Sequence, residues 1–179
     1  MQAQLLGDYR PPSSWKRGGF LIRFFWFLVG KPLFACWLPG TPWRKFLLYL
    51  CGAKLGKGGR IKPGVIITHP WMLTIGNDCW LGEHSWIDNL APVNIGDSVC
   101  ISQGAYLCTG NHNFKKPGFD LRLGPITIES QAWIGAKAII APSSVIGAGS
   151  VVCLGSVVTG NVSSLEIVCG NPANKVGMR

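Results

Sequence analysis

Residues 126–158 read ITIESQAWIGAKAIIAPSSVIGAGSVVCLGSVV, and an aliphatic residue recurs in this stretch at every sixth position. The recurring positions are Ile128, Ile134, Ile140, Ile146, Val152 and Val158. A period of six differs from the 3.6-residue period of an amphipathic helix and from hairpins with regular turn signals. Small residues such as Ala132 and Ser144 stand two positions before the aliphatic ones. The stretch therefore predicts short strands joined by tight corners.

The same period extends upstream to residue 55. Nine earlier positions carry it, namely Leu55, Ile61, Ile67, Ile75, Leu81, Ile87, Ile95, Ile101 and Leu107. Six extended residues at about 3.3 Å each form a side of about 20 Å, and three sides close a triangular turn. Successive turns then stack at about 4.8 Å through sheet hydrogen bonds. We predict an all-β fold, a parallel β-helix of about five triangular turns over residues 53–163.

One interruption of the period is much longer than the others. The gaps after Ile67 and Ile87 add two residues each, whereas Leu107 and Ile128 lie 21 residues apart. Fifteen residues are thus inserted, at about residues 113–127. A long loop on a regular scaffold is usually functional, so we expect a site beside this insertion.

Residues 1–52 and 164–179 lie outside the repeat. Thr41 and Pro42 suit the start of a helix, as a capping hydroxyl and as the first helical residue. Apolar residues follow at helical spacing, which predicts an amphipathic helix over residues 42–51. We expect residues 20–51 to cover one end of the β-helix and the C-terminal tail, residues 164–179, to fold back over the other.

The positive charge is confined to the N-terminal third of the chain. The formal net charge is +9, and residues 1–62 carry eleven Lys and Arg against one acidic residue. Twelve of the 19 aromatic residues also precede residue 50. Basic and aromatic side chains together favour an anionic membrane surface, so residues 10–50 predict peripheral contact at the inner face of the cytoplasmic membrane. The alternative is an aromatic cap with solvated charges; a nucleic-acid partner is not expected.

Neither a membrane-spanning helix nor a disulfide framework is expected. Arg23, Lys31 and Pro32 interrupt the apolar N-terminal stretch, which falls short of about 20 continuous apolar residues. The seven cysteines include no C-x-x-C pair. We therefore expect buried free thiols in a reducing cytosol and no metal site.

Three motifs carry a resemblance to a known family. They are Trp86–Pro92 (WIDNLAP), Ser102–His112 (SQGAYLCTGNH) and Gly170–Ala173 (GNPA). With the repeat, they make residues 45–179 resemble the hexapeptide-repeat acetyltransferases, most closely the colanic-acid and exopolysaccharide acetyltransferases, which are related to the maltose and galactoside acetyltransferases. The resemblance implies a left-handed β-helix and a homotrimer whose sites lie between two subunits. It also implies acetyl-CoA as co-substrate, without a metal.

The resemblance further implies a reaction. His112 lies in the family's Thr-Gly-X-His motif, which makes it the general base for direct attack of the acceptor on acetyl-CoA. The implied acceptor is a hydroxyl of a sugar or glycan intermediate in exopolysaccharide or O-antigen biosynthesis, with a lipid-linked glycan preferred. Asp88, Asn89 and Asn113 are candidate acceptor contacts, although Asp and Asn are also typical of tight corners. Glu83, His84 and Arg122 are weaker candidates.

By the same resemblance, coenzyme A lies along the edges of the turns. The matched residues are Trp133, Ala136, Leu154 and Thr159, with Lys175 and Arg179 as further candidates. Family members often carry a Lys after the matched Thr, whereas this chain has Gly160 there. Lys175 and Arg179 either replace that charge or belong to a frayed tail.

Three alternatives remain open from the sequence. The acceptor could be a small free sugar or another alcohol or amine. The β-helix could be a non-enzymatic scaffold or a membrane-tethered adaptor. A zinc enzyme of the γ-carbonic anhydrase type needs three converging His side chains, whereas His69, His84 and His112 fall at different phases of their turns.

Overall fold

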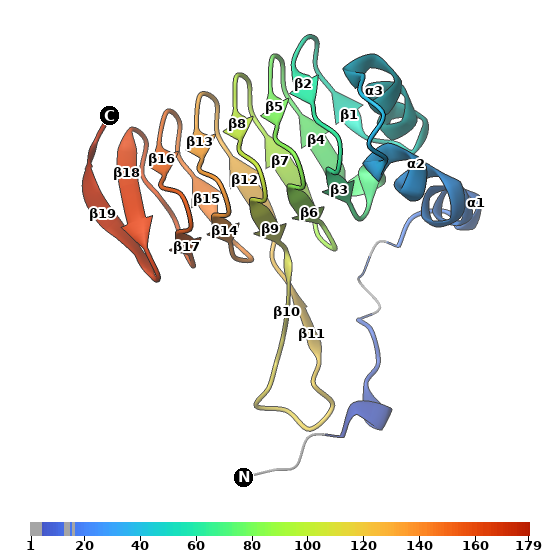
Figure 1. Cartoon of the computed structure of the whole chain (residues 1–179). Helices are drawn as coiled ribbons and strands as arrows, with labels where there is room; N and C mark the ends of the chain where they lie inside the picture. Colours follow the sequence, from blue (N-terminus) through green and yellow to red (C-terminus); the bar gives the residue numbers. More distant parts are fainter. Residues whose placement is uncertain (1–4, 13–14, 16) are drawn as a thin grey trace.

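Residues 54–158 wind into a prism whose three sides are parallel β-sheets (Figure 1). The computed structural model describes residues 5–12, 15 and 17–179. Sheet A contains β1 (Lys54–Leu55), β4 (Leu73–Ile75), β7 (Val93–Ile95), β12 (Ile126–Ile128) and β15 (Val145–Ile146). Sheet B contains β2 (Arg60–Ile61), β5 (Trp80–Leu81), β8 (Cys100–Ile101), β13 (Trp133–Ile134), β16 (Val151–Val152), β18 (Glu166–Gly170) and β19 (Ala173–Met178). Sheet C contains β3 (Ile66–Ile67), β6 (Trp86–Asp88), β9 (Tyr106–Cys108), β14 (Ile139–Ile140) and β17 (Val157–Val158).

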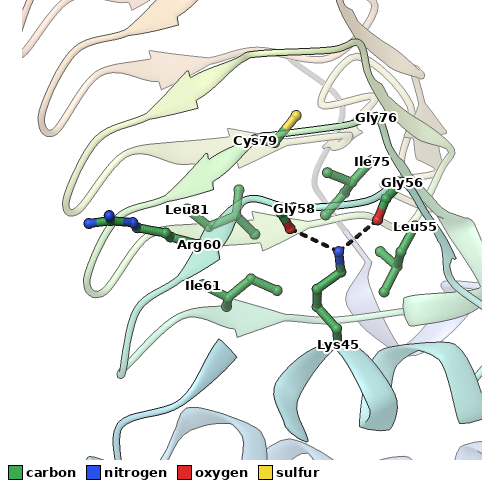
Figure 2. Close-up of a pocket in the computed structure, with 10 residues that line it drawn as sticks. All are labelled: Lys45, Leu55, Gly56, Gly58, Arg60, Ile61, Ile75, Gly76, Cys79 and Leu81. Atoms are coloured by element: carbon green, nitrogen blue, oxygen red, sulfur yellow. Dashed lines mark hydrogen bonds between the residues drawn. The ribbon is translucent and has the colours of Figure 1, made fainter. Parts of the chain in front are cut away.

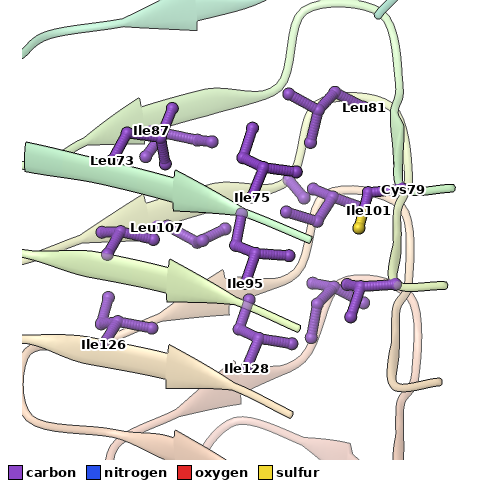
Figure 3. Packing of buried hydrophobic residues seen from close by; sticks show 14 of the residues in the cluster. Leu73, Ile75, Cys79, Leu81, Ile87, Ile95, Ile101, Leu107, Ile126 and Ile128 are labelled. Atoms are coloured by element: carbon purple, nitrogen blue, oxygen red, sulfur yellow. The ribbon is translucent and has the colours of Figure 1, made fainter. Parts of the chain in front are cut away.

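The periodic aliphatic side chains fill the interior of the prism. Fourteen of the fifteen predicted positions are buried, and Leu55 in the first turn is half-buried. In-register pairing stacks Ile75, Ile95 and Ile128 in one column on sheet A (Figure 3). Burial of one such side chain contributes roughly 1.5–3 kcal/mol. The predicted β-helix is confirmed, and β18 adds part of a sixth turn to the five that the spacing indicates.

The corners of successive turns form three edges, named here AB, BC and CA after the sheets that they join. Residues 76–79, 82–85 and 89–92 are the three corners of the second turn. Corners stack through backbone hydrogen bonds, as where Gly155 N donates to Ala136 O (2.8 Å) on the BC edge. Many corners contain one residue with positive φ, among them Asp78 and His84. Asp78 suits this conformation, because Asp and Asn tolerate positive φ better than most non-glycine residues.

Helices cover the first turn of the prism (Figure 1). A short 3-10 helix, η1 (Leu6–Asp8), precedes α1 (Phe20–Phe25), the π-helical turn η2 (Trp26–Gly30), α2 (Lys31–Ala35) and α3 (Thr41–Leu50); a further 3-10 turn, η3 (Pro70–Met72), lies in the CA corner of the first turn. No helix among the described residues is both long enough and apolar enough to cross a membrane.

Helix α3 closes the end of the prism, near the predicted bounds. The N-cap is Gly40, so the prediction of a Thr41 cap is wrong: Thr41 Oγ1 instead accepts from Ile61 N (3.0 Å). Lys45 Nζ donates to the carbonyl oxygens of Gly56 (2.6 Å) and Gly58 (3.0 Å), which would otherwise be unpaired at the first turn (Figure 2). The cavity around Lys45 holds only about 20 Å³, so this end of the prism is closely packed.

Arg44 fixes the chain between α2 and α3. Its side chain is fully buried and donates to the carbonyl oxygens of Phe34 (3.0 Å), Cys36 (2.7 Å), Leu38 (2.7 Å) and Gly40 (3.0 Å). Burial lowers the pKa of this guanidinium, and the carbonyl oxygens compensate for its lost hydration. One of the N-terminal positive charges is therefore structural.

The insertion forms a hairpin that projects from the CA edge (Figure 1). Strand β10 (Gly110–His112) pairs antiparallel with β11 (Leu121–Leu123), and residues 113–120 form the tip. Ile126 and Thr127, which the spacing places at the end of the insertion, belong to β12. The hairpin is thus the longest departure from the triangular turns.

The C-terminal residues close the far end of the prism. Strand β18 pairs parallel with β16, and β19 folds back antiparallel on β18. Cys153 and Cys169 form a disulfide, because in-register pairing brings their Cα atoms to 5.0 Å. The expectation that all seven cysteines are free is wrong for this pair, because the six-residue spacing did not predict β18 as a neighbour of β16.

Candidate active site

His112 is the last residue of β10, next to the tip of the β10–β11 hairpin. Its Nδ1 lies 2.7 Å from the carbonyl oxygen of Phe119. A carbonyl oxygen only accepts, so this contact assigns the proton to Nδ1 and the lone pair to Nε2. The two rings are stacked, with centroids 4.2 Å apart and an interplanar angle of 4°. The half-buried imidazole is thereby fixed in a tautomer that can accept a proton at Nε2.

The backbone of the tip places Phe119 for this contact. Phe119 has a φ of +50°, a left-handed conformation that bulky residues rarely adopt. The adjacent bond from Asn113 N to Asp120 O (2.8 Å) holds the two sides of the tip together. Backbone strain of this kind is often found at functional sites, where the surrounding structure maintains it.

An N-terminal segment lies beside the hairpin. We call the described residues of 5–17 the strap; Figure 1 shows it reaching the hairpin tip. Leu5 N donates to Pro117 O (2.9 Å), and the ring of Tyr9 lies 5.8 Å from that of His112. The imidazole is therefore flanked by the stacked Phe119 and the tilted Tyr9.

Asp88 belongs to a polar cluster on the outer face of sheet C. Its Oδ1 accepts from Thr68 Oγ1 (3.0 Å), and its Oδ2 accepts from the hydroxyl of Tyr106 (3.3 Å). Trp86 stacks near Tyr106 with ring centroids 4.8 Å apart. Burial, with Cys108 and Asp88 nearby, raises the pKa of Tyr106, so its hydroxyl keeps the proton that it donates. The half-buried carboxylate of Asp88 is thus oriented at the start of the CA corner.

The side chains of two other predicted acceptor contacts, Asn89 and Asn113, form hydrogen bonds with backbone groups instead. Asn89 is fully buried, donates from Nδ2 to His69 O (2.7 Å) and accepts at Oδ1 from His69 N (2.8 Å). Asn113 is buried, and its Oδ1 accepts from Lys115 N (3.3 Å) at the hairpin tip. Asn89 thus joins the CA corners of the first two turns, and Asn113 stabilises the hairpin tip next to His112.

The weaker acceptor candidates lie at two places. Glu83 and His84 are exposed in a BC corner, and Arg122 is exposed on β11, paired with Asn111. Within one chain, Arg122 lies on the hairpin with His112 whereas Glu83 and His84 occupy a different edge. Among the described residues, no three His, Cys, Asp or Glu side chains gather where they could hold a metal ion.

The predicted coenzyme A contacts divide among all three edges. Ala136 and Leu154 lie in successive BC corners, where Leu154 is 77% exposed. Thr159 follows β17 into a CA corner, and Arg179 donates to carbonyl oxygens of two AB corners, at Gln131 (3.0 Å) and Gly149 (3.3 Å). A single chain therefore does not bring these residues together.

Trp133 faces a groove on sheet B beside the BC edge. Its Nε1 donates to Ser102 Oγ (2.9 Å), and the groove holds about 560 Å³. Glu83, Arg60 and Lys62 also line it. Lys175 lies on β19 at the end of the same sheet, where it pairs with Glu166 at 3.6 Å. The groove therefore combines an aromatic wall with two cations.

Sequence reasoning missed the groups that orient the predicted ones. Phe119, Tyr9, Thr68 and Tyr106 each contact His112 or Asp88. The six-residue spacing could not predict the contacts of Phe119 or Tyr9, because both residues belong to segments outside the repeat. Thr68 directly follows β3, and Tyr106 pairs with Trp86, two residues before Asp88, so the register of sheet C offers a signal that could have found both.

Comparison with known proteins finds relatives of the same architecture. A family model described as the hexapeptide repeat of succinyl-transferase matches residues 72–108 and 125–160. A protein of Escherichia coli (strain K12), named as the colanic acid biosynthesis acetyltransferase WcaF, is 37% identical over 172 residues, 95% of this chain and 94% of that protein. Nodulation protein L of Rhizobium leguminosarum bv. viciae is 35% identical over 103 residues, 56% of this chain and 54% of that protein.

Solved structures agree in fold. A hexapeptide-repeat containing acetyltransferase of Vibrio cholerae superposes with a TM-score of 0.80 at 25% identity, over 90% of this chain and 94% of that one. A galactoside acetyltransferase in complex with coenzyme A gives a TM-score of 0.74 at 23% identity, over 88% and 77%. The second likeness is one of fold alone.

Proposed function

Because this chain belongs to the hexapeptide-repeat acetyltransferase family, we propose that it transfers an acetyl group from acetyl-CoA to a sugar hydroxyl. One observation carries the proposal: the bond from His112 Nδ1 to Phe119 O leaves Nε2 free to act as a general base. The acceptor class is a glycan intermediate of exopolysaccharide or O-antigen assembly. The name of the Escherichia coli relative supports this class.

The reaction needs one proton transfer in each direction. His112 Nε2 removes the proton of the acceptor hydroxyl as its oxygen bonds to the thioester carbonyl carbon. The resulting imidazolium keeps its Nδ1–H on Phe119 O and is stabilised by that carbonyl. As the carbon–sulfur bond breaks, the same imidazolium returns a proton to the departing thiolate. No covalent enzyme intermediate is required.

The remaining candidates have separate roles. Asp88 accepts a hydrogen bond from an acceptor hydroxyl, while Asn89 and Asn113 position the segments beside His112. Arg122, on the hairpin, contacts the acceptor. Glu83 and His84 lie at the BC edge, where they would contact an acceptor that extends past this edge. Coenzyme A follows the edge at Trp133, Ala136 and Leu154, with Thr159, Lys175 and Arg179 nearer its nucleotide end. The backbone N–H groups of the corners and the groove cations suit the amides and phosphates of this molecule.

The acetyltransferase acts as a homotrimer in this proposal. Every strand of sheet C places one apolar or aromatic residue on the outer face, next to the polar cluster of Asp88 and Thr68; these residues are Ile66, Trp86, Tyr106, Ile139 and Val157. The outer face of sheet A carries Lys54, Thr74, Asn94, Thr127 and Val145. An apolar outer face is typical of an interface. Three prisms packed on sheet C would place the BC edge of one beside the CA edge of the next, which unites His112 with Ala136 and Leu154.

A peripheral membrane location fits the helical cap. Phe20, Leu21 and Leu28 are 71%, 79% and 62% exposed. Arg23 lies among them, and Arg17 precedes them. Exposed apolar side chains beside cations suit an anionic lipid surface, so residues 10–50 bind the inner face of the cytoplasmic membrane. Within that range, Ser13, Ser14 and Lys16 lie outside the described residues.

The test is release of coenzyme A thiol from acetyl-CoA in the presence of glycan acceptors. His112→Ala should lower kcat by about 10²–10⁴-fold, the usual contribution of a general base. Asn94→Ala, exposed on sheet A, is the matched control and should keep full turnover. Full turnover by the His112 variant would remove the imidazole from the mechanism. Acetyl transfer to free sugars but not to larger glycans would mean that the acceptor is a small free sugar.

A further inference from the structure

A cavity separate from His112 lies between the strap and the first helices. It holds about 450 Å³. Tyr9, Trp15, Arg17, Arg23, Phe27 and His69 line most of it. Two guanidinium groups thus share a partly apolar enclosure, which is the composition expected of a site for a multiply charged anion.

The arginines of this cavity lie beside aromatic side chains. Among the side chains that the structure describes, which leave out that of Asp8, neither Arg17 nor Arg23 is paired with a carboxylate. The guanidinium carbon of Arg17 lies 5.0 Å from the ring centroid of Trp15. The indole N–H of Trp15 is shielded from solvent and has no hydrogen-bond partner among the residues that the structure describes. An unpaired buried donor is costly, so an oxygen-rich ligand would satisfy it.

The cavity connects the proposed active site with the apolar helical face. Tyr9 lines the cavity and also lies 5.8 Å, centroid to centroid, from the ring of His112. Arg23 and Phe27 line both this cavity and a groove of about 400 Å³. Phe20, Phe24 and Leu28 complete that groove. An apolar groove, a cationic cavity and an imidazole therefore follow one another along the molecule.

We propose that this cavity binds the diphosphate of a lipid-linked sugar, the acceptor of the reaction proposed above. Arg17 and Arg23 pair with the diphosphate, and the Trp15 indole donates to one of its oxygens. The isoprenoid chain lies against Phe20, Phe24 and Leu28, while the sugar extends past Tyr9 toward His112. The continuous apolar groove favours this occupant over a nucleotide sugar, which has no apolar chain to fill it.

The test measures binding of geranylgeranyl diphosphate to the full-length protein by calorimetry. Geranylgeraniol, UDP-glucose and inorganic pyrophosphate serve as comparison probes. Geranylgeranyl diphosphate should bind most tightly, since only it fills both the groove and the cavity. The double variant Arg17→Gln/Arg23→Gln should weaken its binding by about 100-fold, roughly tenfold for each lost charge-assisted contact. Lys54→Gln, an exposed cation on sheet A, should leave binding within about twofold.

Two further variants keep the outcomes distinct. Trp15→Phe retains the ring, removes the N–H and should weaken binding by about five- to tenfold. The His112→Ala variant should bind geranylgeranyl diphosphate as tightly as the wild type does. Its loss of acetyl transfer therefore tests the proposed function, whereas its binding affinity tests the proposed diphosphate site. Equal affinity for geranylgeraniol, tighter binding of UDP-glucose, or an unaffected double variant with wild-type thermal stability would each overturn the proposal.

Discussion

The regular turns of the prism and the irregular segments outside it have different roles in this molecule: the turns provide the stable core, and the irregular segments surround His112. Each turn of the prism repeats one arrangement. On each side an aliphatic residue points inward, and a small residue often stands two positions before it. The hairpin and the strap repeat nothing, yet they hold His112 through Phe119 and Tyr9. Stability is thus distributed over many equivalent positions, whereas the proposed chemistry depends on a few contacts made once. The difference indicates where a substitution destroys the fold and where it destroys only activity.

The largest effect on stability should come from the cap, where one side chain joins several segments. Arg44→Ala leaves four carbonyl oxygens, one in a buried contact and three in part-buried ones, without their donor. We expect a loss of about 3–5 kcal/mol in the free energy of unfolding, measured by urea denaturation. Arg122→Ala, an exposed arginine on β11, should change it by less than about 0.5 kcal/mol. Equal effects of the two variants would contradict a structural role for Arg44.

Adjacent residues on one strand of sheet A test the periodic pattern. Ile146 is fully buried in the core, and Val145 beside it is 37% exposed on the outer face. Ile146→Ala should lower the free energy of unfolding by about 2–5 kcal/mol, because it leaves a cavity. Val145→Ala should cost less than about 1 kcal/mol. Urea denaturation of both variants measures these losses. A larger loss for Val145→Ala than for Ile146→Ala would mean that the assignment of Ile146 to the interior is wrong.

A third variant separates positioning from stability. Phe119→Ala keeps the backbone carbonyl but removes the ring that stacks on His112. We expect kcat to fall roughly tenfold, as a misoriented imidazole loses part of its contribution, with KM for acetyl-CoA and the melting temperature unchanged. Phe119→Tyr should restore most of the rate. A melting temperature that falls together with the rate in both variants would point to a structural role alone.

The smallest effect should be a pH dependence of stability. Burial lowers the pKa of His69 below its ordinary value of 6.5. The unfolded chain therefore binds this proton more tightly, so stability is fully present above pH 6.5 and declines as the pH falls below it. His69→Gln should flatten that part of the profile of melting temperature against pH. An equally steep decline in the variant would assign the effect to other groups.

The sequence is informative where one physical requirement repeats. Ile134 and its equivalents meet the same interior at each turn, so their spacing alone predicts the β-helix and its core. His112 could be proposed as a site residue because it ends a motif that resembles a known family. Phe119 and Tyr9 could not, since their contacts depend on a left-handed residue at the hairpin tip and on a strap over 100 residues away in the chain. The disulfide was missed because β18 carries no mark of the repeat.

The most direct measurement is acetyl transfer by mixed trimers of two inactive variants. His112→Ala removes the base at the CA edge, and Ala136→Trp blocks the donor path at the BC edge. In the proposed homotrimer, two chains co-expressed under different tags would give mixed trimers in which one interface in three combines an intact His112 with an intact neighbouring BC edge. Purified mixed trimers should regain acetyl transfer well above either parent. Mixed trimers as inactive as both parents would contradict a site shared between two prisms.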